Sequence, residues 1–244
     1  MTETGPRGSA EIEVWHGVTA ADSEPPDGDL EILSEGERAR CARFVRAADR
    51  ARFAVSHAAV RRVLAGYLGT GPAQVRFGRV PCCGCGDTEH GPPRIDWPAT
   101  DLTFSLSGSA DHWALAVGRG RPLGVDIEVP RAVNVTELAG ACLTQAEQDC
   151  LAAAPEPDRP RLFYRCWTRK EAVLKACGLG LAGPLSALDT QPGSTGPAEV
   201  AHACPAGPGL WLVQDLPVPA GSPWLGAIAQ PAGEAALINL RAAG

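Results

Sequence analysis

Residues 163–181 read FYRCWTRKEAVLKACGLGL, and the rest of the chain is arranged around this stretch. Apolar side chains recur in it near helical spacing, which predicts a helix with one buried face. These side chains are Phe163, Trp167, Val173, Leu174 and Cys177. Gly178 and Gly180 are expected to end the helix, because glycine tolerates the left-handed conformation in which many helices terminate.

The predicted helix carries both lysines of the chain. Of the 22 basic residues, only Lys170 and Lys175 are lysine, and all the others are arginine. Arginine is a rigid fork that stays charged, whereas lysine is a compact ammonium on a flexible stem. A chain that otherwise uses arginine is therefore expected to need lysine here for geometry or proton transfer. Glu171 shares a helix face with Lys175, although a solvated ion pair would explain that spacing equally well.

A second stretch supplies two more carboxylates. Residues 122–128 read PLGVDIE, in which apolar and acidic residues alternate as they do in a strand. Asp126 and Glu128 are therefore expected to project from one face. Mg²⁺ commonly takes one or two protein carboxylates together with substrate phosphates. We interpret this pair as a magnesium site, with Glu171 as the candidate third ligand.

Composition narrows the class of protein. The chain has 244 residues, of which 45% are hydrophobic and 20% charged, as is ordinary for a globular protein. A net charge of −6 does not indicate nucleic-acid binding, and no run reaches the length of a membrane span. The first ten residues lack the apolar segment of a secretory signal. Nine cysteines, an odd number, predict reduced thiols and hence a cytoplasmic location.

The motif GVDIE, followed about forty residues later by WTRKEAVLKA, resembles the paired signature of the Sfp-type 4'-phosphopantetheinyl transferases. The resemblance extends over most of the chain. It implies an enzyme that moves the phosphopantetheine arm of coenzyme A, with Mg²⁺, to a serine of an apo acyl or peptidyl carrier protein. The other product is 3',5'-ADP. The family also implies a monomer that works in secondary metabolism.

The resemblance further implies an α/β (α+β) fold of two similar α/β subdomains related by pseudo-two-fold symmetry, with the active site in the cleft between them. The expected division is a disordered N-terminus at residues 1–10, an N-terminal subdomain at 11–121, and a C-terminal subdomain at 122–244 that carries the metal site. Periodicity predicts strands at residues 11–18, 102–107, 112–118, 210–216, 224–230 and 236–240, and helices after Ser34 and at 47–68 and 145–153.

The resemblance assigns roles to individual residues. Glu171 is expected to be the base for the carrier serine, and Lys175 to stabilise or protonate the leaving phosphate. Lys170 is expected to contact phosphate or to pair with a carboxylate. The family usually has a histidine where this chain has Gly108. The expected coenzyme A contacts are Arg40, Arg52, Ser107, Gly108, Lys170 and Lys175, and the expected metal ligands are Asp126, Glu128 and Glu171.

Several alternatives stay open. A Mg²⁺-dependent phosphoanhydride hydrolase would need the same carboxylates, and a non-catalytic member of the family would still bind coenzyme A. Glu147 matches an acidic residue near the family's metal site but also suits a helix surface. Residues 91–93 resemble the family's turn beside the adenine. We interpret the preceding loop as a glycine-rich surface loop rather than a zinc site, because a second ligand pair is missing; its candidate ligands are Cys82, Cys83, Cys85 and His90.

Overall fold

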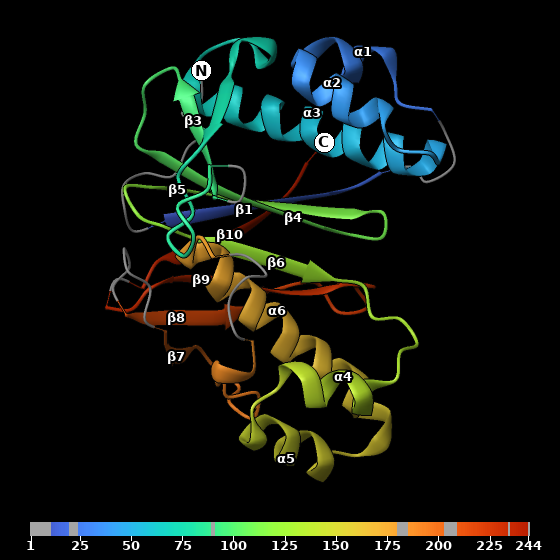
Figure 1. Ribbon diagram of the computed structural model, residues 1–244, viewed down its shortest axis with the longest axis vertical. Helices are drawn as coiled ribbons and strands as arrows, with labels where there is room; N and C mark the ends of the chain where they lie inside the picture. The colour runs from blue at the N-terminus through green and yellow to red at the C-terminus, as the bar shows by residue number, and fades with distance from the viewer. Residues whose placement is uncertain are drawn as a thin grey trace.

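A computed structural model describes residues 11–19, 24–88, 91–179, 185–202, 209–233 and 235–243. The expected disorder of residues 1–10 lies outside these ranges. The described chain forms two four-stranded sheets with helices packed on them (Figure 1). None of the described helices combines the length and the apolar character needed to cross a membrane.

The first sheet has the strand order β10-β1-β5-β4. Its strands are β1 (Glu11–Val18), β4 (Leu102–Ser109), β5 (His112–Arg119) and β10 (Leu237–Ala242). The long helix α3 (Ala47–Leu68) covers the outer face of this sheet, and α1 (Asp27–Ile32) and α2 (Glu35–Ala42) pack against α3 (Figure 1). A hairpin of β2 (Arg76–Arg79) and β3 (Pro93–Trp97) leads from α3 to β4.

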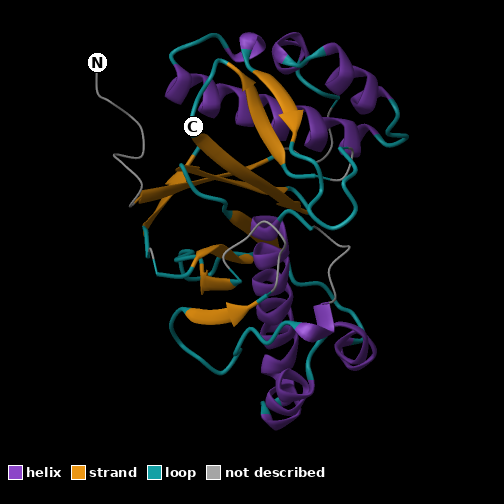
Figure 2. Ribbon diagram, turned by 60° about the vertical axis from the view of Figure 1, so that its left-hand side comes forward, coloured by secondary structure: helices purple, strands orange, loops and turns teal. Residues whose placement is uncertain are grey.

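The second sheet has the strand order β6-β9-β8-β7, and all its pairs are antiparallel. The strands are β6 (Gly124–Glu128), β7 (Ala198–Ala201), β8 (Leu210–Asp215) and β9 (Leu225–Pro231). The helix α6 (Arg159–Cys177) runs alongside this sheet, as Figure 2 shows. Near its beginning lie α4 (Val135–Cys142) and α5 (Gln145–Ala153).

Local sequence signals set the ends of the helices. Ser34 and Thr144 each form a complete capping box at the start of α2 and α5, with Glu37 and Glu147 as the third residue of the helix. Gly69 and Gly178 end α3 and α6 with φ angles of 63° and 75°. Residues with a Cβ rarely adopt this left-handed conformation, so the two long helices stop where glycine occurs.

Gly124 allows α6 to lie directly against β6. A Cβ at this position would lie 2.0 Å from the carbonyl oxygen of Ala172 and 2.5 Å from the backbone nitrogen of Ala176. Only glycine avoids this overlap with the helix backbone. The close approach places the side chains of α6 over the strand that carries Asp126 and Glu128.

The expected mixed α/β class is confirmed, and every predicted strand and helix is present. β10 differs from the expected division of the chain, because it pairs in parallel with β1 in the first sheet rather than joining the second half. Its apolar side chains Ile238 and Leu240 pack into a core that the two halves share, with Ile12 on one side and Val125 on the other, so β10 can complete the first sheet without leaving this core. The pseudo-two-fold relation of the two halves stays a prediction.

Candidate active site at the junction of the two sheets

The edge of β6 that does not pair with β9 lies against β4 of the first sheet. Three serines alternate along β4 and therefore face the same side. We call Ser105, Ser107 and Ser109 the serine ladder. Their Oγ atoms accept hydrogen bonds from alternate backbone N–H groups: Ser105 from Val125 at 3.1 Å, Ser107 from Ile127 at 3.2 Å, and Ser109 from Val129 at 3.1 Å.

The serine ladder also contacts the two predicted carboxylates. Ser107 Oγ donates to Asp126 Oδ1 at 2.8 Å, and Ser109 Oγ donates to Glu128 Oε2 at 2.5 Å. Burial raises the pKa of both carboxyls. At Asp126 the positive charge of Lys175 acts in the opposite direction, but the effect of burial is larger. Two carboxylates are thus fixed side by side at the junction of the two halves.

Lys175 and Glu171 reach the same place from α6. Lys175 Nζ donates to Asp126 Oδ1 at 2.8 Å and to the carbonyl oxygen of Val125 at 3.1 Å. Glu171 lies one turn earlier and is buried. Burial, and then the negative charge of Asp126, raise the pKa of the Glu171 carboxyl to about 7. A carboxyl with such a pKa can exchange a proton near neutral pH.

The donor chemistry of this site suits a hard divalent cation. Asp126 Oδ2 and Glu171 Oε1 are buried and have no hydrogen-bond partner among the described residues. Such oxygens are costly to bury unless a cation or a donor satisfies them. No three acidic, histidine or cysteine side chains of the described ranges converge closely enough to hold an ion alone. The two unpartnered carboxylate oxygens still fit Mg²⁺, which usually takes one or two protein carboxylates and completes its shell with water and substrate phosphate.

Three of the predicted coenzyme A contacts line one cavity. Arg52, Ser107 and Gly108 are among the walls of a space of about 370 Å³ between α3 and the β4–β5 hairpin. The guanidinium of Arg52 is held by Asp49 at 2.9 Å and by Asp111 at 2.7 Å. These two ion pairs aim a charged group at the cavity without help from a ligand.

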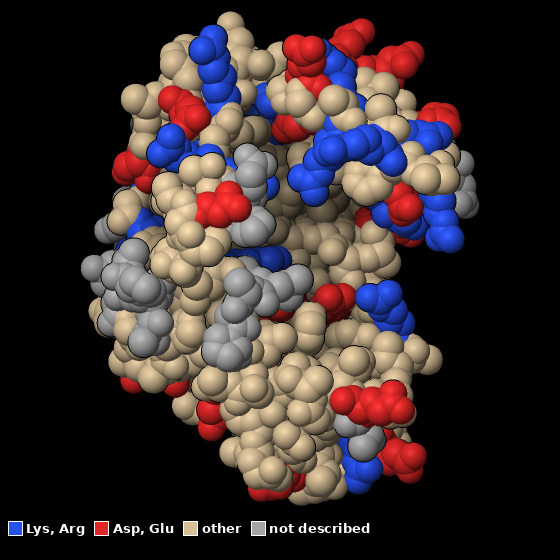
Figure 3. All heavy atoms as spheres, viewed as in Figure 1, with Lys and Arg blue, Asp and Glu red and all other residues tan. Residues whose placement is uncertain are grey.

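Arg40 lies beside the same cavity. Its guanidinium carbon stands 5.3 Å from the ring centroid of Phe53, which also lines the cavity. Figure 3 shows a hollow between the helices of the first half and the lower half of the molecule, with basic side chains gathered above it over α2 and α3. In a chain of net charge −6, such a gathering of basic side chains is an uneven distribution of charge, which favours the approach of an anion.

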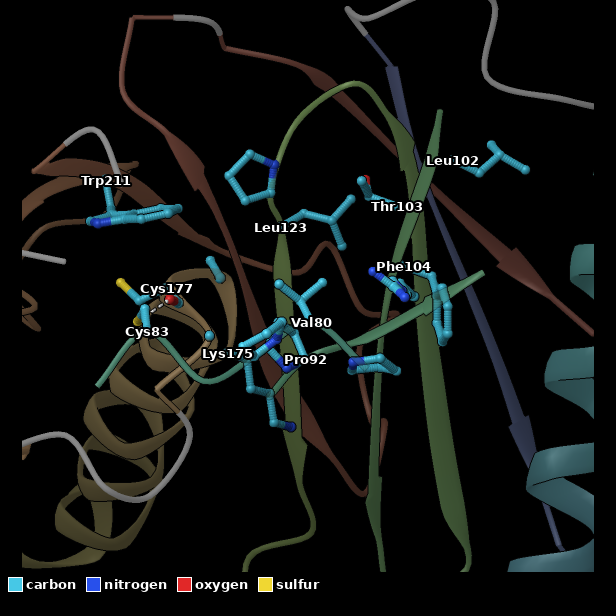
Figure 4. A pocket seen from close by; sticks show the side chains of 16 residues that line it. Val80, Cys83, Pro92, Leu102, Thr103, Phe104, Leu123, Lys175, Cys177 and Trp211 are labelled. Atoms are coloured by element: carbon cyan, nitrogen blue, oxygen red, sulfur yellow. Dashed lines mark hydrogen bonds between the residues drawn. The ribbon is translucent and has the colours of Figure 1, made fainter. Parts of the chain in front are cut away.

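A second cavity, of about 300 Å³, has Lys175 in its wall (Figure 4). The other walls are mostly apolar and come from the loop before β3, the start of β4 and the end of α6. Cys83 Sγ donates to the carbonyl oxygen of Cys177 at 3.1 Å and so ties this loop to α6. Pro92 and Pro93 line the cavity as well. Mostly apolar walls with two basic side chains, Lys175 and Arg94, suit a flat or aliphatic group that carries a phosphate.

The structure contradicts the expected coenzyme A contact of Lys170. Its side chain is fully buried, and Nζ lies 2.6 Å from Glu147 Oε2 and donates to the carbonyl oxygens of Leu185 and Leu188. The prediction that Lys170 contacts phosphate is wrong, and the alternative, pairing with a carboxylate, is confirmed. The proposed place of Glu147 near the metal is also wrong, because Lys170 and Thr190 occupy its carboxylate.

Ser109 was not among the predicted site residues, although the sequence contains a pattern that could have identified it. Serine at every second position of 105–109 matches the alternation at 124–128. The cysteine loop keeps its interpretation as a prediction, because His90 lies outside the described residues. Within the described residues, Cys82, Cys83 and Cys85 form no disulfide.

Comparisons with known proteins agree with this site. A sequence profile described as the 4'-phosphopantetheinyl transferase superfamily matches residues 122–229. The 4'-phosphopantetheinyl transferase HetI of Nostoc sp. is 33% identical over 215 residues, which cover 85% of this chain and 84% of HetI. The 4'-phosphopantetheinyl transferase Sfp of Bacillus subtilis is 26% identical over 163 residues, which cover 66% of this chain and 67% of Sfp. This chain belongs to the 4'-phosphopantetheinyl transferase superfamily.

Proposed function

We propose that this protein transfers the 4'-phosphopantetheine arm of coenzyme A to a serine of an apo acyl or peptidyl carrier protein. One observation carries the proposal: Asp126, Glu128, Glu171 and Lys175 come together where β6 and α6 meet the first sheet. Phosphoryl-type displacement mainly requires positioning and neutralisation of charge, which is what these groups offer.

In the proposed reaction the carrier serine Oγ attacks the β-phosphorus of coenzyme A, on the pantetheine side. The bond from that phosphorus to the bridging oxygen breaks, and 3',5'-ADP leaves. Glu171, buried beside Asp126, accepts the proton of the serine hydroxyl. Lys175 stabilises the negative charge on the leaving phosphate. Mg²⁺, when bound by Asp126, Glu128 and Glu171, supplies further charge neutralisation at the pyrophosphate.

The two cavities support a place for the nucleotide. Arg52 and Arg40 are suited to the 3'-phosphate, and Gly108, which has no side chain, to a close approach of the pyrophosphate. Ser107 lines the same cavity, but its hydroxyl proton is already donated to Asp126. Pro92 and Pro93 belong to the turn that, by resemblance to the family, lies beside the adenine. We further infer a monomer that works in the cytoplasm in secondary metabolism. The absence of disulfides among the described cysteines is typical of a reducing compartment.

Mass spectrometry of an apo carrier protein incubated with the protein, coenzyme A and Mg²⁺ tests this proposal. The carrier is expected to gain one phosphopantetheine, and 3',5'-ADP to appear in equal amount. Release of 3',5'-ADP with no carrier present would instead identify a phosphoanhydride hydrolase. Binding of coenzyme A without any product would identify a non-catalytic member of the family.

Lys175→Arg is expected to lower kcat about 10²-fold although the charge is kept. Lys175 Nζ contacts Asp126 and Val125 O from one point, and a planar fork cannot occupy that point on a helix packed so closely against β6. Steady-state transfer kinetics measure the effect, and Lys175→Met serves as the control without charge. Wild-type kcat in the arginine variant would show that any cation is sufficient there.

Gly108→His is expected to lower the KM for coenzyme A about tenfold, with kcat little changed. The added side chain would restore a pyrophosphate donor worth about 1–3 kcal/mol. A Cβ at this position would meet only the carbonyl oxygen of His112, at an ordinary 3.6 Å. Gly108→Ala is the matched control, and its KM should stay close to wild type. A large rise in KM for Gly108→His would place the cofactor elsewhere.

A further inference from the structure

Each hydroxyl of the serine ladder has one proton and can therefore donate one hydrogen bond. The hydroxyl of Ser109 both accepts and donates a hydrogen bond. Ser109 Oγ accepts from the N–H of Val129 at 3.1 Å, so its proton is directed to Glu128 Oε2 at 2.5 Å. We infer that Ser109 is a positioning residue, which fixes Glu128 in the orientation that holds the metal. The inference rests on the proposed function, because it assumes that Glu128 is a ligand.

The need for such a residue follows from the side chain of Glu128. It is only half-buried and turns about three bonds, so it would otherwise sample several orientations. A hydrogen bond from a hydroxyl that is itself anchored to the strand removes that freedom. The bond engages only one carboxylate oxygen, Oε2, and leaves Oε1 for another partner.

Asp126, two residues before Glu128 on β6, is held by hydrogen bonds in the same way. Ser107 and Lys175 both donate to its Oδ1, whereas its Oδ2 is buried with no partner among the described residues. In both side chains one oxygen is held and the other is presented. The serines of β4 and the acidic residues of β6 thus alternate in step, and this places both carboxylates in a defined orientation.

Ser105 provides a control within the same ladder. It accepts from the N–H of Val125 at 3.1 Å, as Ser109 does from Val129. The residue before Val125 is Gly124, which has no side chain to hold. Ser105 therefore shares the role of completing the edge of β6 but has no part in orienting a carboxylate. Comparing the two serines separates a structural role from a positioning role.

The test is a calorimetric titration of the full-length protein with Mn²⁺, with saturating coenzyme A and no carrier protein. Ser109→Ala is expected to raise the dissociation constant about 10- to 100-fold, as loss of a partner that orients a metal ligand commonly does. Ser105→Ala should change it less than about twofold, and Ser109→Thr, which keeps the hydroxyl, should stay near wild type. In a Glu128→Gln background, Ser109→Ala should have no further effect.

Ser109→Cys guards against a variant that fails to fold, because it keeps the volume and offers only a weak donor. It should weaken Mn²⁺ binding in the same direction while thermal melting shows a folded protein. Equal effects of Ser105→Ala and Ser109→Ala, an unchanged constant in Ser109→Ala, or no Mn²⁺ binding by wild type would each overturn the inference. Absence of transfer by wild-type protein would count against the proposed function instead, so the two failures are distinguishable.

Discussion

Asp126→Asn is expected to lower the rate of phosphopantetheinyl transfer about 10³-fold, the largest effect on activity that we predict. The side chain keeps its shape, and its carbonyl oxygen can still accept from Ser107 and Lys175. Its amide NH₂ then takes the place of Oδ2, the buried oxygen without a partner among the described residues. A donor would face the position where a cation is needed, so metal binding and charge neutralisation are lost together.

Initial rates of carrier modification at saturating coenzyme A and Mg²⁺ measure this effect, and thermal melting verifies the fold. Asp101→Asn is the matched control. Asp101 also pairs with a basic residue, Arg119 at 2.6 Å, but on the surface of the first half. Its variant should keep at least half of the wild-type rate. If Asp126→Asn does the same, the carboxylate pair is not the site of phosphoryl transfer.

Glu147→Ala is expected to lower the free energy of unfolding by about 3–5 kcal/mol, the largest effect on stability that we predict. Glu147 and Lys170 form an ion pair in which both side chains are fully buried. Removing the carboxylate leaves the ammonium of Lys170 with carbonyl acceptors only, at Leu185 and Leu188. The loss is a large share of the total stability of a typical protein, which is roughly 5–15 kcal/mol.

Urea unfolding at neutral pH measures this loss. Glu137→Ala is the control, because Glu137 holds the same N-terminal position in α4 but is exposed, and its change should stay within about 0.5 kcal/mol. Combining Glu147→Ala with Lys170→Met should recover part of the stability, since no uncompensated charge then remains. A loss below about 1 kcal/mol in Glu147→Ala would show that water reaches Lys170.

Much of the secondary structure could be predicted from the sequence, because strand alternation and helix capping depend on only a few neighbouring residues. Alternation identified β1 and the carboxylate strand, and the capping signals identified α2 and α5. The bounds of α3, Ala47–Leu68, agree with the prediction. The short strands of the β2–β3 hairpin and β7 were not predicted, because four or five residues give too little periodicity.

The error at Lys170 has a different cause. Because lysine is rare in this chain, the sequence suggests one function for both Lys170 and Lys175. Their spacing of five positions, however, separates them by roughly 140° around a helix. They therefore point to different surroundings, one to the junction with the first half and one to Glu147. The helical spacing alone is enough to predict that the two lysines point in different directions. The identity of the buried partner depends on how α5 packs against α6, which no local pattern specifies.

The place of β10 bears on the order in which the protein can form during synthesis. Glu11 pairs with Leu237, and Arg241 forms an ion pair with the buried carboxylate of Glu13, 228 positions away along the chain. The edge of β1 that faces β10 thus stays unpaired until β10 has been synthesised. Contacts of such long range slow folding, because closing a long loop costs entropy before the contact forms. The first sheet is consequently completed only after all four strands of the second sheet have been synthesised.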